Sequence, residues 1–361
     1  EGEGGEKRKE EEEGGKREGR GGRKGKGRGK RKKKGKRGKE GERKKEGRKR
    51  EGGRERKRAS NRLVIFNDTH GWHSEQLTHS LSQFGIEAVL TDLAACRIDL
   101  DSPTGLFIPG FENELPAAAM VRGIAPGFLE QITLRMDVLH TLAELGIPVF
   151  NPATAIEYTV DKARTSLRLH QAGLSTPRTW ACEDSNMAKQ IITRELNMGN
   201  KIVMKPLFGC QGKGITLIEE LSQFEQLPPV GGAYYLQEYI APELEGIWQD
   251  WRLLVIDNEV CAAMSRRANK WITNFAQGAS CFATTVTEEM RQLAVKATAA
   301  VNADYAGVDL IRDKNGHFTV LEVTSVPAWK GLYQATGTDV AMHLAKALVK
   351  RIEQKQATHA L

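Results

Sequence analysis

The chain has 361 residues, a net charge of +8 at pH 7 and an apolar fraction of 39%. Residues 1–58 contain only Gly, Glu, Lys and Arg, and their 28 basic and 13 acidic side chains carry +15, so the remaining residues carry −7. The overall basicity therefore belongs to one segment and does not indicate that the folded part binds nucleic acid.

Residues 1–58 have no apolar side chain to bury, so we expect a disordered tail. Two interpretations of this tail are open. A basic arm could bind nucleic acid or another acidic surface. Alternatively, the segment is translated from a purine-rich tract upstream of a start near residue 60, because Gly, Glu, Lys and Arg are the amino acids with all-purine codons. We favour the second interpretation and expect no nucleic-acid partner.

The remaining residues are typical of a cytoplasmic protein without a membrane partner. No apolar run approaches the ~18 residues that a membrane span requires. The cysteines are scattered and form no C-x-x-C pair, which suits a reducing compartment and argues against a zinc site. They are Cys96, Cys182, Cys210, Cys261 and Cys281.

Residues 59–150 are predicted to form a doubly wound α/β domain, because strand and helix patterns alternate along them. Short apolar runs predict strands at 62–68, 86–92, 105–110 and 147–151. Amphipathic patterns that end in Gly predict helices at 74–85 and 129–146.

Residues 151–241 and 242–355 are predicted to form two α+β units, each built on an antiparallel sheet. The first begins with a helix at 154–173 and continues with strands at 201–207, 214–219 and 233–240. The second contains a hairpin at 250–268 that turns at Asp257-Asn258, and a hairpin at 306–325 that turns at 314–316. Helices are expected at 288–303 and 339–354.

Two features carry chemistry. The stretch "KPLFGCQGKG" (205–214) ends a strand and brings several glycines together, so its backbone N–H groups could approach phosphate oxygens. On its own, this pattern is equally typical of a flexible turn. Asp309 and Glu322 lie on the two strands of one predicted hairpin, which would place both carboxylates together where a Mg²⁺ ion could bind. Two solvated acids at strand ends are the alternative.

The order of the motifs along residues 61–350 resembles the ATP-grasp superfamily. The segments that carry the resemblance are "VDKARTSLRLHQAGLSTP", "MKPLFGCQGKGI", "LQEYI", "DWRLLVIDNEVCAAMSRRA", "WITNFAQGA", "AGVDLIRD" and "LEVTSVPAWKGL". Within it, the chain is most similar to the RimK-type ligases that add L-glutamate to a carboxylate. The pieces "GWH", "VRGI", "WITN" and "PAWKGL" resemble a narrower group associated with tetrahydromethanopterin genes.

This resemblance implies an ATP-grasp fold, in which the two α+β units clasp ATP, and it implies site residues. Lys162 and Lys205 would contact the α- and β-phosphates, and Gly209, Gly212 and Gly214 would form a lid. The adenine would face Gln237, Glu238, Tyr239 and Ile240, and the ribose would face Asp250. Asp309, Glu322 and Thr324 would form the site for Mg²⁺ or Mn²⁺. The catalytic set would be Arg252, Arg266 and Asn274.

The implied reaction joins L-glutamate to a carboxylate-bearing cofactor of the tetrahydromethanopterin type through an acyl phosphate, with ATP consumed; a homo-oligomer is left open. Thr324 departs from the family pattern, in which Asn supplies a metal ligand. An adapted working site, a weakened enzyme and a sequence error are the alternatives, and we favour the first. The alternative function is an ATP-binding module with weakened or lost catalysis. Ile272, Ala276 and Gln277 replace commoner basic residues, which argues against an acidic protein tail as substrate.

Three other residues have two interpretations each. Trp72 and His73 open a helix after the first strand, where open α/β sheets bind ligands, so they could contact a substrate. A packed helix start explains them equally well. Arg122 could bind a substrate carboxylate, although a lone Arg in a loop is more often solvated.

Overall fold

The computed structural model describes residues 61–358 except 210–211, 229–230 and 243–245. The predictions for residues 1–58 and for Cys210 therefore lie outside the described residues. Within the described part, no helix has both the length and the apolar character to cross a membrane. The described cysteines are free. The domain boundaries predicted at 150 and 241 stay predictions.

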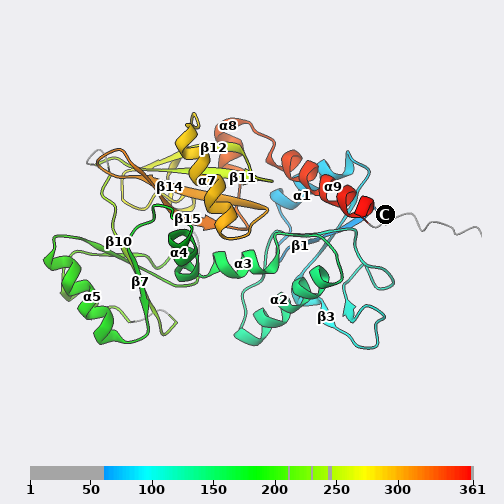
Figure 1. Cartoon of the computed structure of the whole chain (residues 1–361), viewed down its shortest axis with the longest axis horizontal. Coiled ribbons are helices and arrows are strands. Elements are labelled where there is room, and N and C mark those ends of the chain that lie inside the picture. The colour runs from blue at the N-terminus through cyan, green and yellow to red at the C-terminus, as the bar shows by residue number, and fades with distance from the viewer. Residues whose placement is uncertain (1–60, 210–211, 229–230, 243–245, 359–361) are drawn as a thin grey trace, which may run out of the picture. The chain divides into compact units, whose positions relative to one another are not determined.

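A parallel sheet with the order β2-β1-β5-β6 forms the first unit. Its strands are β1 (Arg62–Phe66), β2 (Glu87–Thr91), β5 (Ala119–Val121) and β6 (Val149–Phe150). Side chains alternate across β1: Leu63 and Ile65 pack with helices α1 (Trp72–Ser82) and α9 (Val340–Thr358). Val64 and Phe66 pack with α2 (Leu129–Glu144) on the other face. Helices on both faces confirm the predicted doubly wound α/β domain (Figure 1).

The strand predicted at 105–110 is not part of this sheet. Its residues form β4 (Leu106–Phe107), which pairs antiparallel with β3 (Arg97–Ile98). The 3₁₀ turn η1 (Leu93–Ala95) precedes β3 in the chain. The position beside β1 is taken by β5, whose three residues are fully buried. The sequence did not reveal β5 because its three residues did not stand out as an apolar run bounded by turn residues, as those around β6 and β9 (Thr216–Ile218) did.

The second unit begins with a helix pair where one helix was predicted. Helix α3 (Ala153–Val160) ends at Asp161, and α4 (Lys162–Gln171) begins at the next residue. The Asp161 side chain accepts a hydrogen bond of 2.9 Å from the Arg164 N–H and so caps α4. The break places Lys162 in the first turn of α4.

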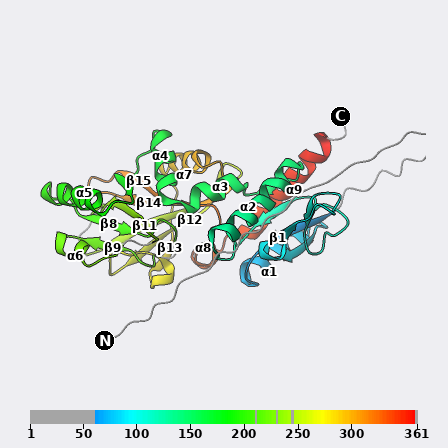
Figure 2. The ribbon, with the colours of Figure 1, turned by 90° about the horizontal axis from the view of Figure 1, so that it is seen from below.

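The predicted strands of this unit form an antiparallel sheet with the order β7-β10-β8-β9. They are β8 (Ile202–Lys205), β9 (Thr216–Ile218) and β10 (Tyr234–Glu238), joined by the unpredicted β7 (Thr179–Cys182). Helices α5 (Ser185–Asn197) and α6 (Leu221–Glu225) pack on one face of the sheet (Figure 2).

The third unit is an antiparallel sheet with the order β13-β12-β11-β14-β15. Its strands are β11 (Trp248–Ile256), β12 (Glu259–Ala268), β13 (Ser280–Ala283), β14 (Tyr305–Arg312) and β15 (Phe318–Thr324). Both predicted hairpins are confirmed. Asp257 and Asn258 turn the first with φ angles of 48° and 66°, and Gly316 turns the second with φ 85°. Helix α7 (Glu288–Ala300) covers one face, and η2 (Phe275–Gln277) and α8 (Lys330–Thr336) complete the unit.

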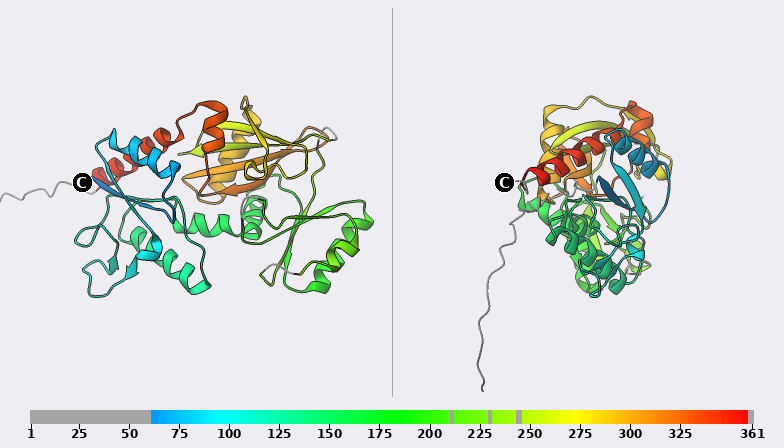
Figure 3. Two further views of the ribbon diagram at one scale, coloured as in Figure 1. Left: turned by 180° about the vertical axis from the view of Figure 1, so that it is seen from behind. Right: turned by 90° about the vertical axis from the view of Figure 1, so that its right-hand side faces the viewer.

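Helix α9 was expected to close the third unit, but it also belongs to the first. Its residues Leu344 and Leu348 share one buried cluster with Leu63, Leu77 and Leu81 of the first unit. The same cluster includes Leu254 of β11 and Met264 of β12. Figures 1 and 3 show α9 running along α1. A single core therefore joins the two ends of the described chain.

Candidate active site

One pocket collects most of the predicted site residues. It is lined by strand ends from the second and third units and by the loops that follow β8 and β12. The predicted residues that line it are Lys162, Lys205, Gly209, Gly212, Gln237, Glu238, Tyr239, Ile240, Asp250, Arg266, Asn274, Asp309 and Glu322. These residues come from segments up to 160 positions apart in the chain.

The acidic pair lies on neighbouring strands, as the hairpin predicted. Asp309 of β14 is the direct cross-strand partner of Glu322 of β15, next to an irregularity in the pairing between Asp309 and Leu310. Directly opposed residues on an antiparallel pair have Cβ atoms about 5 Å apart. Asp309 is 2% exposed, and Glu322 is half-buried. Two carboxylates therefore share one end of the pocket.

Two arginines bind the Asp309 carboxylate. The Arg252 Nε and Nη2 atoms donate to its two oxygens at 2.7 Å each, and Arg266 Nη2 donates to Oδ2 at 2.8 Å. Burial alone would raise the pKa of the Asp309 carboxyl, but Arg252 and Arg266 lower this pKa to about 2. The carboxylate is therefore ionised across the physiological range.

Arg266 extends this network to Asp250. Its Nε and Nη2 atoms donate to the two Asp250 oxygens at 2.6 Å each, and Thr273 Oγ1 donates to Oδ2 at 2.6 Å. Burial raises the pKa of Asp250 although Arg266 opposes the shift. Both oxygens already accept hydrogen bonds from protein groups, so the assignment of Asp250 to a ribose stays a prediction.

Two lysines face the acids across the pocket. Lys205 ends β8, and its Nζ donates to Gln237 Oε1. Burial lowers the pKa of Lys205 to about 8, which Glu322 and Asp309 partly oppose and Lys162 assists. The Lys162 Nζ donates to the Gly209 carbonyl oxygen at 2.7 Å, so α4 is tied to the glycine-rich loop.

The glycine-rich loop packs against the segment 271–274. Gly212 has φ 71°, and a Cβ atom there would lie 2.6 Å from Asn274 Oδ1 and 3.1 Å from Ile272 Cγ2. Only glycine therefore fits this contact. Thr273 lies between Ile272 and Asn274 in the chain, and its hydroxyl donates to the Asp250 carboxylate. The loop and the acidic network thus meet at one short segment.

The end of β10 forms the other end of the pocket. The N–H groups of Glu238 and Tyr239 donate to the carbonyl oxygens of Arg178 and Lys201 at 2.8 and 2.9 Å, so neither N–H is available to a ligand. Trp248 Nε1 donates to the Tyr239 hydroxyl at 2.9 Å. The Trp271 ring meets the Tyr239 ring edge-on at 6.2 Å. These rings give this end an aromatic wall.

Three predicted residues do not line the pocket. Arg252 acts on it through Asp309, and Gly214 lies in the loop with φ 70°. Thr324 pairs with Gly307 at the end of β15 and is half-buried. Its role as a metal ligand stays a prediction. Sequence reasoning missed Trp248 and Thr273, since neither residue type signals a site without its tertiary neighbours.

Arg122 is buried, so the expectation that it is solvated was wrong. It is 8% exposed, donates to the Tyr305 hydroxyl and the Pro327 carbonyl oxygen at 3.1 Å each, and lies over the Trp329 ring. His73 Nε2 accepts a hydrogen bond of 3.1 Å from the Trp329 N–H. Burial and the nearby Arg122 and Lys330 lower the pKa of His73 to about 4. These contacts join β5 and α1 to the segment after β15.

Comparisons with known proteins show which family the chain is similar to. The model of the RimK-like ATP-grasp domain matches residues 159–348. A tetrahydromethanopterin:alpha-L-glutamate ligase of Methanococcus maripaludis is 29% identical over 78% of this chain and 96% of its own. A probable alpha-L-glutamate ligase of Alkalilimnicola ehrlichii is 32% identical over 81% of this chain and 97% of its own.

Solved structures share the fold. The ATP-grasp ligase PsnB, determined with a minimal precursor, Mg and ADP, superposes with a TM-score of 0.63 at 21% identity, over 81% of this chain and 99% of that one. A RimK domain protein from Sphaerobacter thermophilus superposes with a TM-score of 0.58 at 21% identity, over 80% and 99%. The fold prediction is therefore confirmed. The chain belongs to the RimK-like ATP-grasp family, whose members are ligases that form C–N bonds.

Proposed function

We propose that the protein uses ATP and Mg²⁺ to join the amino group of L-glutamate to a carboxylate of a tetrahydromethanopterin-type acceptor. The observation that carries this proposal is the pairing of Asp309 with Glu322 in the pocket that also holds Lys162 and Lys205. The relatives named for tetrahydromethanopterin support the acceptor class, and a relative named coenzyme gamma-F420-2:alpha-L-glutamate ligase supports glutamate as the added group.

The acidic pair fits a magnesium ion. Mg²⁺ is bound through one or two carboxylates and completes its shell with phosphate oxygens and water. The described residues contain no cluster of three or more His, Cys, Asp or Glu side chains that would form a closed cage, and two carboxylates on adjacent strands meet the requirement. When bound, the ion would neutralise phosphate charge, and Glu322 and Asp309 would hold it. Asp309 would have to give up part of its contact with Arg252 or Arg266 to do so, because these two arginines donate to both of its oxygens.

The basic residues fit a nucleotide's phosphates. Lys162 and Lys205 supply point charges on the side of the pocket where the glycine-rich loop begins. Gly209 and Gly212 line the pocket with backbone alone, which lets phosphate oxygens approach closely. The adenine would then lie toward Glu238, Tyr239 and Ile240, against the aromatic wall.

The chemistry has two steps. A carboxylate oxygen of the acceptor attacks the γ-phosphorus of ATP, so an acyl phosphate forms and ADP leaves. The glutamate amine then attacks the acyl carbon, loses a proton, and expels inorganic phosphate as the amide forms. Arg266, which is held in place by Asp250 and Asp309, would stabilise the charge on the phosphoryl group in flight. Because water would hydrolyse the acyl phosphate, the site has to exclude water during the reaction, and Gly209, Gly212 and Gly214 are the residues proposed to allow this closure.

The test is ADP release by the purified chain with ATP, Mg²⁺, L-glutamate and a tetrahydromethanopterin-type acceptor. Release should require both substrates, and Glu322→Ala should lower it by about a hundredfold or more, the order expected for losing one metal-held phosphate contact. Glu259→Ala, an exposed acid at the start of β12, is the matched control and should leave the rate unchanged.

Two outcomes would contradict the proposal. Full activity of Glu322→Ala would show that the metal assignment is wrong. ADP binding without turnover of any carboxylate and amine pair would instead support the alternative, an ATP-binding module with lost catalysis. In that case Thr324→Asn would be expected to restore turnover.

A further inference from the structure

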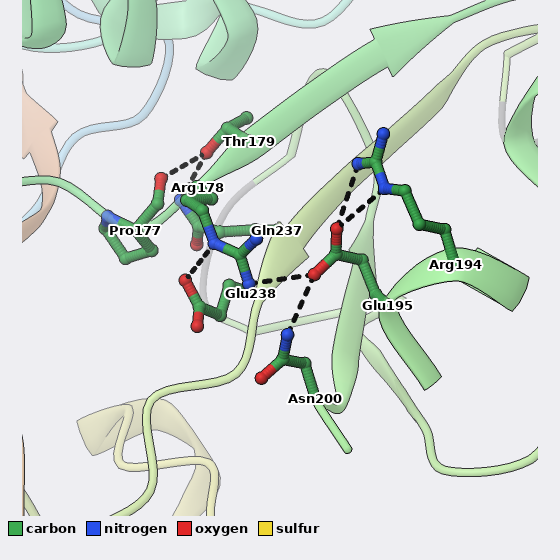
Figure 4. A network of polar contacts seen from close by, with 8 residues as sticks. All are labelled: Pro177, Arg178, Thr179, Arg194, Glu195, Asn200, Gln237 and Glu238. Atoms are coloured by element: carbon green, nitrogen blue, oxygen red, sulfur yellow. Dashed lines mark hydrogen bonds and ion pairs between the residues drawn. The ribbon is translucent and has the colours of Figure 1, made fainter. Parts of the chain in front are cut away.

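Arg178 connects the end of β10 to a buried acid outside the pocket. It immediately precedes β7, and its Nε donates to Glu238 Oε2 at 3.0 Å while its Nη2 lies 2.8 Å from Glu195 Oε2 (Figure 4). Its carbonyl oxygen also accepts the Glu238 N–H at 2.8 Å. Arg178 therefore holds Glu238 by both its backbone and its side chain.

Glu195 is a fixed anchor for this guanidinium. It lies on α5 with no exposed surface, and it accepts hydrogen bonds from Arg194 at 2.9 Å and Asn200 at 3.0 Å (Figure 4). Burial favours the neutral acid, but Arg194, Asn200 and Arg178 together lower the pKa of Glu195, so it is ionised at neutral pH. A buried carboxylate with three partners cannot reorient freely.

The arrangement acts on the pocket from outside. Glu238 lines the pocket, whereas Arg178 does not appear among its described lining residues. The two side chains differ in exposure, with 25% for Glu238 and 47% for Arg178. Arg178 can therefore influence a ligand only by fixing where the Glu238 carboxylate and the adjoining backbone lie.

We propose that Arg178 is a positioning residue for nucleotide-base recognition, which it achieves by fixing Glu238 between the pocket and the buried Glu195. This inference rests on the proposed binding of ATP. A carboxylate is only a hydrogen-bond acceptor, so where it faces position 6 of a purine it favours the amino group that adenine carries there and repels the carbonyl oxygen that guanine carries there. Glu238 in this position selects adenine over guanine, provided that its carboxylate is held in one orientation.

The shape of the guanidinium explains why arginine is present. Its planar fork donates from Nε and Nη2 in two directions at once, toward Glu238 and Glu195. A lysine ammonium carries its three donors on one nitrogen, so it cannot match two separated acids with the fixed geometry of the guanidinium fork. Arg178→Lys should therefore keep part of the positioning of Glu238, and Arg178→Ala should keep none of it.

Arg194 offers a matched control. It also binds Glu195 and is similarly exposed, at 54%, but it makes no contact with Glu238 among the described residues. If Arg178 serves only to stabilise α5, Arg178→Ala and Arg194→Ala should behave alike. If it positions the base site, only the first should alter nucleotide binding.

The experiment measures dissociation constants for ADP and GDP by titration calorimetry, and the KM for ATP and kcat in the ligase assay, for the full chain and these three variants. Arg178→Ala should weaken ADP binding by about threefold to tenfold, the range expected for releasing one ordered side chain. It should raise the KM for ATP by a similar factor and leave kcat unchanged. It should also lower the ratio of the GDP dissociation constant to the ADP dissociation constant. Arg178→Lys should fall between, and Arg194→Ala should match the unaltered chain.

Three outcomes would overturn the inference. Equal ADP binding by Arg178→Ala and the unaltered chain would show that Glu238 needs no positioning, and equal losses in Arg178→Ala and Arg194→Ala would show a structural role only. If Arg178→Ala does not fold, Arg178→Lys replaces it as the test, because it keeps the positive charge and should still weaken ADP binding. No ADP binding by the unaltered chain would instead overturn the nucleotide site itself and this inference with it.

Discussion

Lys205 is the buried cation of the pocket, and its charge state is sensitive to pH. Burial lowers its pKa to about 8. Glu322 and Asp309 face it from β15 and β14 and favour the charged form, while Lys162 faces it from α4 and disfavours that form. Because this pKa lies close to neutrality, a modest rise in pH removes the positive charge on which phosphate binding would depend.

We therefore predict that ADP binding weakens as pH rises above 8. The protonated ammonium is the form that binds phosphate. With a pKa of about 8, its fraction is about nine-tenths at pH 7, about one half at pH 8 and about one tenth at pH 9. The dissociation constant should therefore rise by about fivefold between pH 8 and 9. Titration calorimetry at fixed ionic strength measures the effect.

Lys205→Arg is the control for this dependence. A guanidinium stays charged throughout this range, so its binding curve should be flat between pH 7 and 9. If the ADP dissociation constant of Lys205→Arg rises with pH as steeply as that of the unaltered chain, another group is responsible for the pH dependence. A flat curve for the unaltered chain would show that Lys205 does not bind the phosphates.

Among single residues, the resemblance to the ATP-grasp superfamily predicted that distant residues such as Lys162 and Lys205 share a site, and they line one pocket. Reasoning from the local sequence alone reached only residues that a short turn brings together. Asp309 and Glu322 could be paired from sequence because a tight turn joins their strands. Thr273 could not be found, because its partner Asp250 is 23 residues away and only the paired strands β11 and β12 bring them together. Arg122 was misjudged for the same reason, since Tyr305 covers it from 183 positions away.

At the scale of elements, the contact between the glycine-rich loop and the segment 271–274 makes a prediction. Gly212→Ala forces a side chain into a left-handed φ of 71° and places its Cβ 2.6 Å from Asn274 Oδ1. Strain of this kind costs about 1–3 kcal/mol. Since the contact joins the two walls of the pocket, ADP binding should weaken by about tenfold in calorimetry.

Gly146→Ala separates backbone strain from the contact. Gly146 also has a positive φ, 76°, but a Cβ there would meet nothing within 4 Å, and it follows α2 in the first unit. This variant should lower thermal stability without changing ADP affinity. Equal affinity losses in both variants would contradict the idea that the contact between the glycine-rich loop and the segment 271–274 supports ADP binding.

The elements that the sequence predicted are those with strong local signals. The turn residues Asp257, Asn258 and Gly316 indicated both hairpins of the third unit, and the structure gives each of them a positive φ. Periodic apolar patterns indicated α2, α7 and α9. Strands β3, β5, β7 and β13 were missed because they have two to four residues and, unlike the equally short β6 and β9, did not stand out in the sequence as apolar runs bounded by turn residues. The break between α3 and α4 was missed because the apolar pattern continues through Asp161, where an N-cap interrupts the helix.

At the scale of the whole described chain, the core around α9 determines how it unfolds. Leu344 has no exposed surface and packs in the cluster that contains Leu63 of β1 and Leu254 of β11. Nothing in the local sequence of α9 reveals these partners, because they lie 281 and 90 positions away. A core shared in this way makes the first and third units stabilise each other, since neither buries its apolar face fully alone.

Leu344→Ala should therefore destabilise both units together. Removing a fully buried leucine side chain costs about 2–5 kcal/mol. For a chain of this size, each kcal/mol lowers the melting temperature by about 2–4 °C. Calorimetry should show the first and third units unfolding in one shared transition at a lower temperature, and amide exchange should accelerate in both β1 and β11. Leu134→Ala, at a position on α2 that is 44% exposed, should change little. If Leu344→Ala splits the transition in two, or accelerates exchange in β11 alone, the first and third units fold independently and the shared cluster does not couple them.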